Sequence, residues 1–342
     1  MPNPFRRRAS RTLALMLLLL ISGVATAQYK LTNLTSNQKG KAKHFDPNLV
    51  NGWGLTFAPG GPIFVADTGT GLATDYNAMG VPQKTVVTVP PASGTGLGSP
   101  TGIVYNSSQE FQVGGAAARF LFGTLDGTIS GWSPANGTQA VIVVNNSGSH
   151  ASYNGLGITN KASGNFLYAP DFTNNRVDVY DGNFKFVTSL RDSKVPSGFV
   201  PLNVQDIGGK IYVAYAAMNP AQGGGYIDIF RENGTLVRRF TQGTPLNQPY
   251  YFAIAPKNFG PLSNTLLISN NTNSGTINGF NLKTGKFVGT IKDAAGKPIK
   301  IDQLWGIDFG GGNVIDGKKN QLFFAAGPNN NNDGLFGVIE FK

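Results

Sequence analysis

The chain has 342 residues, of which 13% are charged, 11% are aromatic and 46 are glycine. Low charge with abundant glycine and aromatic residues argues against a disordered chain and against long amphipathic helices, and it is typical of many short strands joined by tight turns. The sequence contains no cysteine, which excludes disulfides, a cysteine nucleophile and lipid attachment through cysteine.

The N-terminus has the features of a secretory signal peptide at residues 1–27. Four arginines (Arg6, Arg7, Arg8, Arg11) precede a short apolar core, and residues 25–27 match the A-x-A cleavage pattern, so Gln28 would begin the mature protein. The alternative is a membrane anchor, but an apolar core of about 9 to 12 residues is too short to span. We therefore expect a secreted protein, periplasmic or extracellular, with no integral membrane segment after cleavage.

The net charge of +10 includes those four arginines, and the mature chain keeps 24 basic and 18 acidic residues, a net charge of +6. The remaining positive residues are scattered rather than clustered. A solvated basic surface explains them better than a nucleic-acid patch, so no nucleic-acid partner is expected.

Short strands recur along the mature chain with a period of roughly 50 residues, which is in the range of propeller blades. The expected innermost strands, four of which contain glycine, are residues 51–55, 99–103, 154–158, 200–205, 248–254 and 303–307. The expected second strands are residues 63–66, 120–123, 166–169, 211–214, 266–269 and 322–325. A third strand follows in most units. Glycine in the innermost strands would let neighbouring backbones approach closely around a crowded channel.

These repeats predict an all-β fold, a six-bladed β-propeller of four-stranded blades formed by residues 28–342 as a single domain. Residues 29–34 form a strand-like segment without a blade of their own, and the last blade lacks a fourth strand. We expect this mature N-terminal strand to complete the last blade and close the ring, because closure leaves no long sheet edge exposed.

Two groups of residues carry a resemblance to known propellers. Residues 169–181 (APDFTNNRVDVYD) resemble an NHL-type repeat, and residues 65–69 are a partial second copy. Residues 46–55 and 303–307 resemble an uncharacterised family of secreted bacterial propellers, whose members often carry a PEP-CTERM sorting tail. This chain stops at Lys342 without such a tail. The resemblance implies the fold and an export route, and it implies no activity.

Polar residues open the innermost strands and are the first candidates for a site. They are Asn51, Ser99, Asn154, Gln248 and Gln303, with Asn203, Asp206 and Asp302 close by in the sequence. In a propeller we expect them at one end of the central channel, where they could bind a ligand, bond to each other and to water, or hold a hard cation such as Ca²⁺.

The stretch Asn154-Gly155-Leu156 is similar to a metal-ligand position in gluconolactonase-like propellers. That family also needs acidic ligands, for which Asp206 and Asp302 are the loose matches, so the candidate metal ligands are Asn154, Asn203, Asp206 and Asp302. No other cofactor is indicated.

Further candidates are aromatic residues, histidines and loops. Trp53 and Trp305 occupy equivalent positions and could stack on a sugar or act as wedges between blades. His44 and His150 both precede innermost strands, which would place them toward the same rim of the channel, although two surface loop histidines explain them better. The asparagine-rich loops 270–273 and 329–333 could contact a ligand.

The sequence contains no H-E-x-x-H, G-x-S-x-G or phosphate-loop motif. The first hypothesis is therefore a monomeric binding or scaffold module for an extracellular protein or glycan, with ligand contacts from Asn51, Trp53, His150, Asn154, Asn203, Gln248, Gln303 and Trp305. The alternative is a Ca²⁺-dependent lactonase-like hydrolase with its site in the channel. A streptogramin-lyase-like enzyme is a third possibility, and it would need a channel histidine beside acidic residues.

Overall fold

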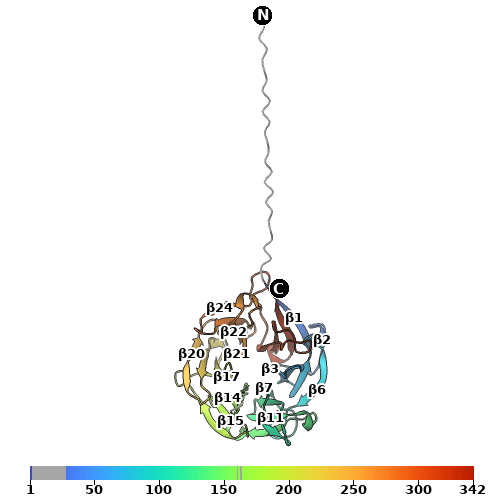
Figure 1. Ribbon diagram of the computed structural model, residues 1–342, viewed down its shortest axis with the longest axis vertical. Helices are drawn as coiled ribbons and strands as arrows, with labels where there is room; N and C mark the ends of the chain where they lie inside the picture. The colour runs from blue at the N-terminus through green and yellow to red at the C-terminus, as the bar shows by residue number, and fades with distance from the viewer. Residues whose placement is uncertain (2–27, 160, 162–163) are drawn as a thin grey trace.

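The computed structural model describes residue 1, residues 28–159, residue 161 and residues 164–342. They form an all-β propeller in which six sheets are arranged as a ring (Figure 1), which confirms the predicted fold class. The predicted signal peptide, residues 1–27, lies outside the described residues apart from Met1.

The first five blades are four-stranded antiparallel sheets, and the strands of each are given from the channel outward. Blade 1 contains β3 (Gly52–Phe57), β4 (Ile63–Asp67), β5 (Leu72–Tyr76) and β6 (Pro82–Thr88). Blade 2 contains β7 (Pro100–Tyr105), β10 (Phe120–Thr124), β11 (Thr128–Trp132) and β12 (Val141–Asn145). Blade 3 contains β13 (Gly157–Ile158), β14 (Phe166–Asp171), β15 (Arg176–Asp181) and β16 (Phe186–Leu190). Blade 4 contains β17 (Phe199–Asp206), β18 (Ile211–Ala217), β19 (Tyr226–Phe230) and β20 (Leu236–Gln242), and blade 5 contains β21 (Pro249–Ile254), β22 (Thr265–Asn270), β23 (Ile277–Asn281) and β24 (Phe287–Thr290).

Blade 6 joins the two ends of the described chain. Its strands from the channel outward are β25 (Leu304–Phe309), β26 (Gln321–Ala326), β27 (Leu335–Phe341), β1 (Tyr29–Ser36) and β2 (His44–Phe45). β1 runs antiparallel to β27, with Tyr29 opposite Phe341 and Ser36 opposite Leu335. The predicted closure by the N-terminal strand is therefore confirmed, and it supplies β27 with the partner that its outer edge would otherwise lack.

Connecting segments carry the remaining short elements. These are the hairpin of β8 (Gln112–Val113) and β9 (Ala116–Ala117), the 3₁₀ turns η1 (Pro134–Asn136), η2 (Ser147–Ser149), η3 (Pro220–Gln222) and η4 (Gly260–Leu262), and the single turn α1 (Pro328–Asn331). No helix among the described residues is long and apolar enough to cross a membrane.

Burial follows the position of each strand within its blade. The second and third strands are covered on both faces by the adjacent blades, so a strand such as β18 is an unbroken buried run. The outer strands are only partly buried and expose residues such as Phe186 and Phe287. In the described residues the buried apolar side chains form six clusters, one at each contact between blades.

Glycines allow the innermost strands of several blades to touch. A Cβ at Gly306 of blade 6 would lie 2.6 Å from the Trp53 carbonyl oxygen, and one at Gly54 of blade 1 would lie 2.7 Å from the Thr101 carbonyl oxygen. Real Cβ atoms essentially never come so close, so only glycine fits at these two positions. This close packing brings the channel-facing side chains of neighbouring blades together.

Candidate functional site

The centre of the propeller is filled by aromatic side chains. Trp53 of β3 and Trp305 of β25 stack with ring centroids 3.6 Å apart and planes at 17°. Tyr250 of β21 packs edge-on against both, at 5.9 Å from Trp53 and 4.9 Å from Trp305. Because the two indole faces cover each other and both side chains are buried, Trp53 and Trp305 act as wedges in this structure and present no open platform for a sugar.

Hydrogen bonds hold these rings in place, and one of them crosses the channel from blade 5 to blade 3. The indole Nε1 of Trp53 donates to Asn51 Oδ1 (2.9 Å), and that of Trp305 donates to Asn331 Oδ1 (3.2 Å). The Tyr250 hydroxyl donates to the Asn154 carbonyl oxygen at 3.0 Å. Asn51 and Asn154, both predicted as ligand contacts, therefore support the aromatic plug, Asn51 through its side chain and Asn154 through its backbone.

A second tyrosine crosses the channel beside the first. The Tyr251 hydroxyl donates to the Leu55 carbonyl oxygen (3.0 Å), which links blade 5 to blade 1. Burial, followed by the nearby Asp308 carboxylate, raises the pKa of Tyr251, so this hydroxyl stays protonated and donates. The sequence analysis did not identify Tyr250 or Tyr251. Their only signal was the unusual pair of large aromatics in an innermost strand that lacks glycine.

Asn203 also lies on an innermost strand, β17 of blade 4. Its side chain is 1% exposed, and neither its Oδ1 nor its Nδ2 has a hydrogen-bond partner among the described residues. It packs against Gly155 of blade 3, at a position where a Cβ would collide with the amide. A buried amide of this kind normally takes a protein or water partner.

The four residues predicted as metal ligands do not converge. Asp206 ends β17 and Asp302 precedes β25, so they lie at opposite ends of the innermost strands. Asn154 Oδ1 accepts from Ser152 (2.9 Å), Asp206 Oδ1 from the Gly209 amide (2.8 Å) and Asp302 Oδ2 from the Asn329 amide (3.0 Å). Among the described residues, no three histidine or acidic side chains are grouped to share a metal ion. The donor set therefore does not fit the candidate Ca²⁺ site.

The two histidines lie apart from the channel and from each other. His44 is in β2, the fifth strand from the channel in blade 6. His150 follows η2 in the exposed loop between blades 2 and 3, with a left-handed backbone (φ 55°). The expectation that both lie at one rim of the channel is wrong for His44, because residues 44–45 pair with the outer strand β1 instead of turning inward.

Gln248 and Gln303, in contrast, are brought together at one rim. They line a polar pocket of about 470 Å³, which we call the rim pocket. Its lining comes from the β18–β19 loop of blade 4, the β22–β23 loop of blade 5 and the segments that enter blades 5 and 6. It consists of Pro220, Ala221, Asn247, Gln248, Asn271, Thr272, Asn273, Ser274 and Gln303. The loop 270–273, expected from its asparagines to be a contact loop, supplies three of these residues.

The rim pocket is held by an unusual backbone. Gln248 (φ 53°) and Gln303 (φ 48°) both adopt the left-handed backbone conformation, which costs free energy for residues other than Gly, Asn and Asp. Backbone bonds stabilise it: the Asn271 amide donates to the Gln248 carbonyl oxygen and the Gln303 amide to the Thr272 carbonyl oxygen, both at 2.8 Å. Strain of this kind often accompanies a binding site.

Three of the five amide side chains that line the rim pocket use their NH₂ groups within the protein. Gln248 donates to the Ala217 carbonyl oxygen (3.0 Å), Asn271 to the Leu304 carbonyl oxygen (3.2 Å) and Gln303 to Asn273 Oδ1 (2.7 Å). Within the described part of the chain, no hydrogen bond reaches the side-chain carbonyl oxygens of these three residues, and the buried Asn247 Oδ1 also has no partner. The rim pocket therefore contains unused acceptors and no charged side chain.

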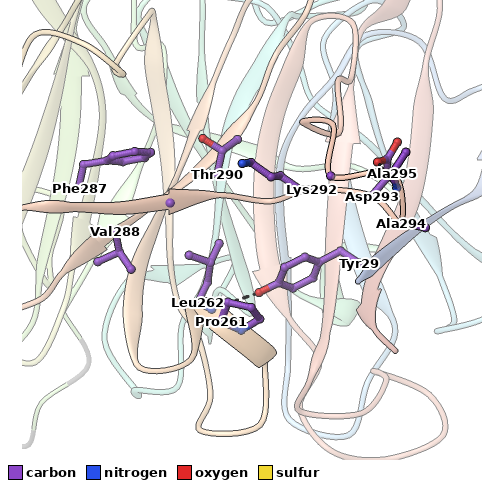
Figure 2. A pocket seen from close by; sticks show the side chains of 12 residues that line it. Tyr29, Pro261, Leu262, Phe287, Val288, Thr290, Lys292, Asp293, Ala294 and Ala295 are labelled. Atoms are coloured by element: carbon purple, nitrogen blue, oxygen red, sulfur yellow. Dashed lines mark hydrogen bonds between the residues drawn. The ribbon is translucent and has the colours of Figure 1, made fainter. Parts of the chain in front are cut away.

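A larger hollow of about 790 Å³ lies at the outer edge of blade 5 (Figure 2). Its walls include the exposed Phe287 and Val288 of β24. Two of its polar side chains are engaged in the fold: the Tyr29 hydroxyl donates to the Phe259 carbonyl oxygen (2.7 Å), and Asp293 Oδ1 accepts from the Ala295 and Lys297 amides (2.9 Å each). With these polar groups satisfied, the hollow is a weaker candidate than the rim pocket despite its size.

Comparison with known proteins gives relatives without an assigned activity. No protein-family profile matches the chain, so the NHL-type and PEP-CTERM assignments are not confirmed. The uncharacterised protein R648 of Acanthamoeba polyphaga mimivirus is 31% identical, with 92% of this chain and 81% of R648 aligned. The uncharacterised protein L690 of the same virus is 30% identical, with 92% and 86% aligned. These relatives are viral, whereas the sequence resemblance pointed to bacterial proteins.

Solved structures agree in fold alone. A protein of unknown function from Bacteroides thetaiotaomicron matches with a TM-score of 0.58 and 11% identity over 92% of this chain and 76% of its own. Virginiamycin B lyase from Staphylococcus aureus matches with a TM-score of 0.55 and 13% identity over 92% and 99%. At such identities the match carries the propeller architecture and no chemistry. From the sequence relationship, this chain belongs to the same protein family as R648 and L690 of Acanthamoeba polyphaga mimivirus.

Proposed function

We propose that the protein is a secreted, non-catalytic binding propeller, and that its rim pocket binds a neutral glycan. The observation that carries this proposal is the lining of the rim pocket, in which amide and hydroxyl groups surround a buried, unpartnered Asn247 Oδ1 and no side chain is charged. The volume of about 470 Å³ lies within the range of small-ligand sites.

The hydrogen-bonding capacity of the rim pocket favours a ligand rich in hydroxyl groups. Three of its five amide side chains, those of Gln248, Asn271 and Gln303, keep their NH₂ donors for the protein and leave oxygen acceptors, which favours a ligand that brings donors of its own. An ammonium ion or a metal cation would find no carboxylate there, and a phosphate would find no cation. A sugar brings several neutral donors at once. The signal-peptide pattern at residues 1–27 supports export, which would place the protein where free glycans occur.

Binding of oligosaccharides to the purified mature protein tests the proposal. The probes are maltoheptaose, cellohexaose and chitohexaose, followed by saturation-transfer NMR and calorimetry. We expect at least one of them to bind and Asn247→Ala to weaken that binding by about 5- to 100-fold, the effect of losing a buried acceptor. Asn247→Ala should fold normally, because its side chain makes no hydrogen bond in the described structure.

Gln83→Ala is the matched control. Gln83 is an amide of blade 1, outside the rim pocket, that donates to the Val81 carbonyl oxygen. Its removal should leave saccharide affinity unchanged. The glycan proposal fails if none of the three saccharides binds, or if Asn247→Ala binds as tightly as the unmodified protein. Binding of a protein partner that Asn247→Ala abolishes would instead assign the rim pocket to a protein ligand.

The metal-dependent lactonase is the alternative function. It would need acidic ligands beside Asn154 and Asn203, yet Asp206 and Asp302 lie at opposite ends of the innermost strands. A lyase of the streptogramin type would need a channel histidine, and His44 and His150 are both outside the channel. No observation favours either enzyme over the binding module.

A further inference from the structure

A second, smaller pocket lies between blades 1 and 2, at the end of the propeller opposite the rim pocket. The residues that follow β3 border it, whereas the rim pocket is bordered by residues that precede β21 and β25. Its volume is about 200 Å³, several times the ~30 Å³ that a water molecule occupies in the liquid. We call it the Asp75 pocket. It has room for a small molecule and is unrelated to the glycan proposal.

Three aromatic rings form one wall of the Asp75 pocket. Phe64 of β4 and Phe120 of β10 are 4.4 Å apart between centroids, and Trp132 of β11 lies parallel to Phe120 at 6.2 Å. The Trp132 indole Nε1 donates to the Gly137 carbonyl oxygen (2.9 Å), so the indole already has its hydrogen bond. The π-faces of such rings carry negative potential and attract cations.

Asp75 of β5 lines the same pocket from the blade 1 side. Its side chain is 3% exposed, and its Oδ1 is buried without a hydrogen-bond partner among the described residues. Burial raises the pKa of Asp75 to about 6, so the carboxyl is largely ionised at neutral pH in spite of its surroundings. A buried carboxylate without a counter-charge is costly, and an incoming cation would relieve that cost.

Two other buried carboxylates on third strands show what Asp75 lacks. Asp178 of β15 is paired with Arg176 (2.7 Å), and Asp228 of β19 is paired with Arg239. Asp75 has no ion pair within the described residues. The fold therefore supplies a cation to each of these carboxylates except the one that lines a pocket.

The mouth of the Asp75 pocket carries the opposite charge. Arg119, which immediately precedes β10, lines the pocket and is exposed. A guanidinium at the mouth would repel a simple cation but would attract the anionic end of a ligand whose positive end reaches Asp75. The Asp75 carboxylate inside the pocket and the Arg119 guanidinium at its mouth are complementary to a molecule with a positive group at one end and a negative group at the other.

We propose that the Asp75 pocket binds a small amino-acid-like zwitterion. Its ammonium group would donate to Asp75 Oδ1 and lie against Phe64, Phe120 and Trp132, and its carboxylate would pair with Arg119. The bound ligand gives the buried carboxylate the partner that the protein does not provide, as Arg176 does for Asp178.

Three probes of matched length separate the two charges: 4-aminobutyrate carries both, n-butylamine only the cation and butyrate only the anion. Titrations are followed by calorimetry and by the Trp132 indole N–H signal in ¹H–¹⁵N spectra of the mature protein, assigned with Trp132→Phe. We expect 4-aminobutyrate to bind and shift that signal, n-butylamine to bind more weakly and butyrate not to bind. Glycine and β-alanine, with shorter charge separations, extend the series.

Two substitutions test the two ends of the site. Asp75→Asn keeps the shape and should weaken 4-aminobutyrate binding by about tenfold or more. Arg119→Gln lies on the surface and should fold in any case. It should weaken 4-aminobutyrate binding and strengthen or preserve that of n-butylamine. Asp293→Asn and Arg231→Gln make the same charge changes on blades 5 and 4 and should leave both affinities unchanged.

The proposal is overturned if none of the zwitterions shifts the Trp132 signal, or if Asp75→Asn binds them with unchanged affinity. It is also overturned if Arg119→Gln binds 4-aminobutyrate more tightly, because the arginine would then be competing for Asp75 and not holding the ligand. Tighter binding of n-butylamine than of 4-aminobutyrate to the unmodified protein would assign the pocket to a simple amine.

Discussion

Trp53 and Trp305 stack face to face at the centre of the propeller, 3.6 Å apart, although 252 positions separate them in the sequence. They come from the first and last blades, which meet only because the ring is closed. The same contact therefore joins blade 1 to blade 6 and fills the channel, and the hydrogen bonds to Asn51 and Asn331 hold the two indoles in place.

This contact predicts a large loss of stability for Trp305→Ala. Removing a buried indole that packs on Trp53 and Tyr250 should lower the free energy of unfolding by about 3 to 5 kcal/mol, and Trp305→Phe should cost less. Urea unfolding followed by circular dichroism measures the change. Met218→Ala, at an exposed apolar residue, is the control. A loss below about 1 kcal/mol for Trp305→Ala would show that the channel plug does not support the fold.

Gly102→Ala should be among the most damaging substitutions in the innermost strands. A Cβ at residue 102 would collide with the backbone of Gly155 and Leu156 in the next blade, and a backbone cannot move aside as a side chain can. We expect a loss of about 3 kcal/mol or more. At Gly148, an added Cβ would meet no heavy atom within 4 Å, so Gly148→Ala is the matched control. Equal melting temperatures for the two variants would contradict the close approach of blades 2 and 3.

Removal of β1 should open the ring. A chain that begins at Asn37 leaves β27 with an unpaired edge and also loses the Tyr29 hydroxyl bond to Phe259. We expect a lower melting temperature and concentration-dependent association, because an exposed edge strand pairs with other chains. Size-exclusion chromatography with light scattering detects this, and a chain that begins at Gln28 is the control. A monomeric, equally stable truncated chain would show that the closure is dispensable.

Asp75 should make stability depend on pH. Its pKa is raised by burial from 3.8 to about 6, so between these values the native state holds a proton that the unfolded state has released. The contribution of Asp75 to the free energy of unfolding therefore falls as pH rises from about 4 to about 6. Asp75→Asn should gain up to about 3 kcal/mol at pH 7.5 and little at pH 4.

Chemical denaturation of both proteins at the two pH values, in the absence of any amine, measures that difference. Asp293→Asn, whose carboxylate accepts hydrogen bonds within an exposed turn, should show no such gain. A gain for Asp75→Asn that is equal at pH 4 and pH 7.5 would mean that the carboxyl has an ordinary pKa.

Much of the fold could be predicted because it depends on local patterns. Short apolar runs between turn residues identified most strands, and the unpaired segment at residues 29–34 led directly to the closure by β1. The candidate site was less predictable. The sequence placed Gln248 and Gln303 at the rim, but it did not identify Asn247 or Asp75, whose roles depend on neighbours from other strands and blades.

The sequence by itself determined how many blades form and how the ring closes, because strand length, turn chemistry and strand pairing within a blade are properties of contiguous residues. Only the tertiary structure decided what occupies the centre. Polar residues at the start of most innermost strands suggested that one end of the channel is lined by polar side chains, yet aromatic side chains fill its centre and Tyr250 and Tyr251 reach across it to Asn154 and Leu55. Whether a side chain lines a channel or fills it depends on the diameter of the closed ring and on the side chains that arrive from the opposite blades, and no single stretch of sequence contains either.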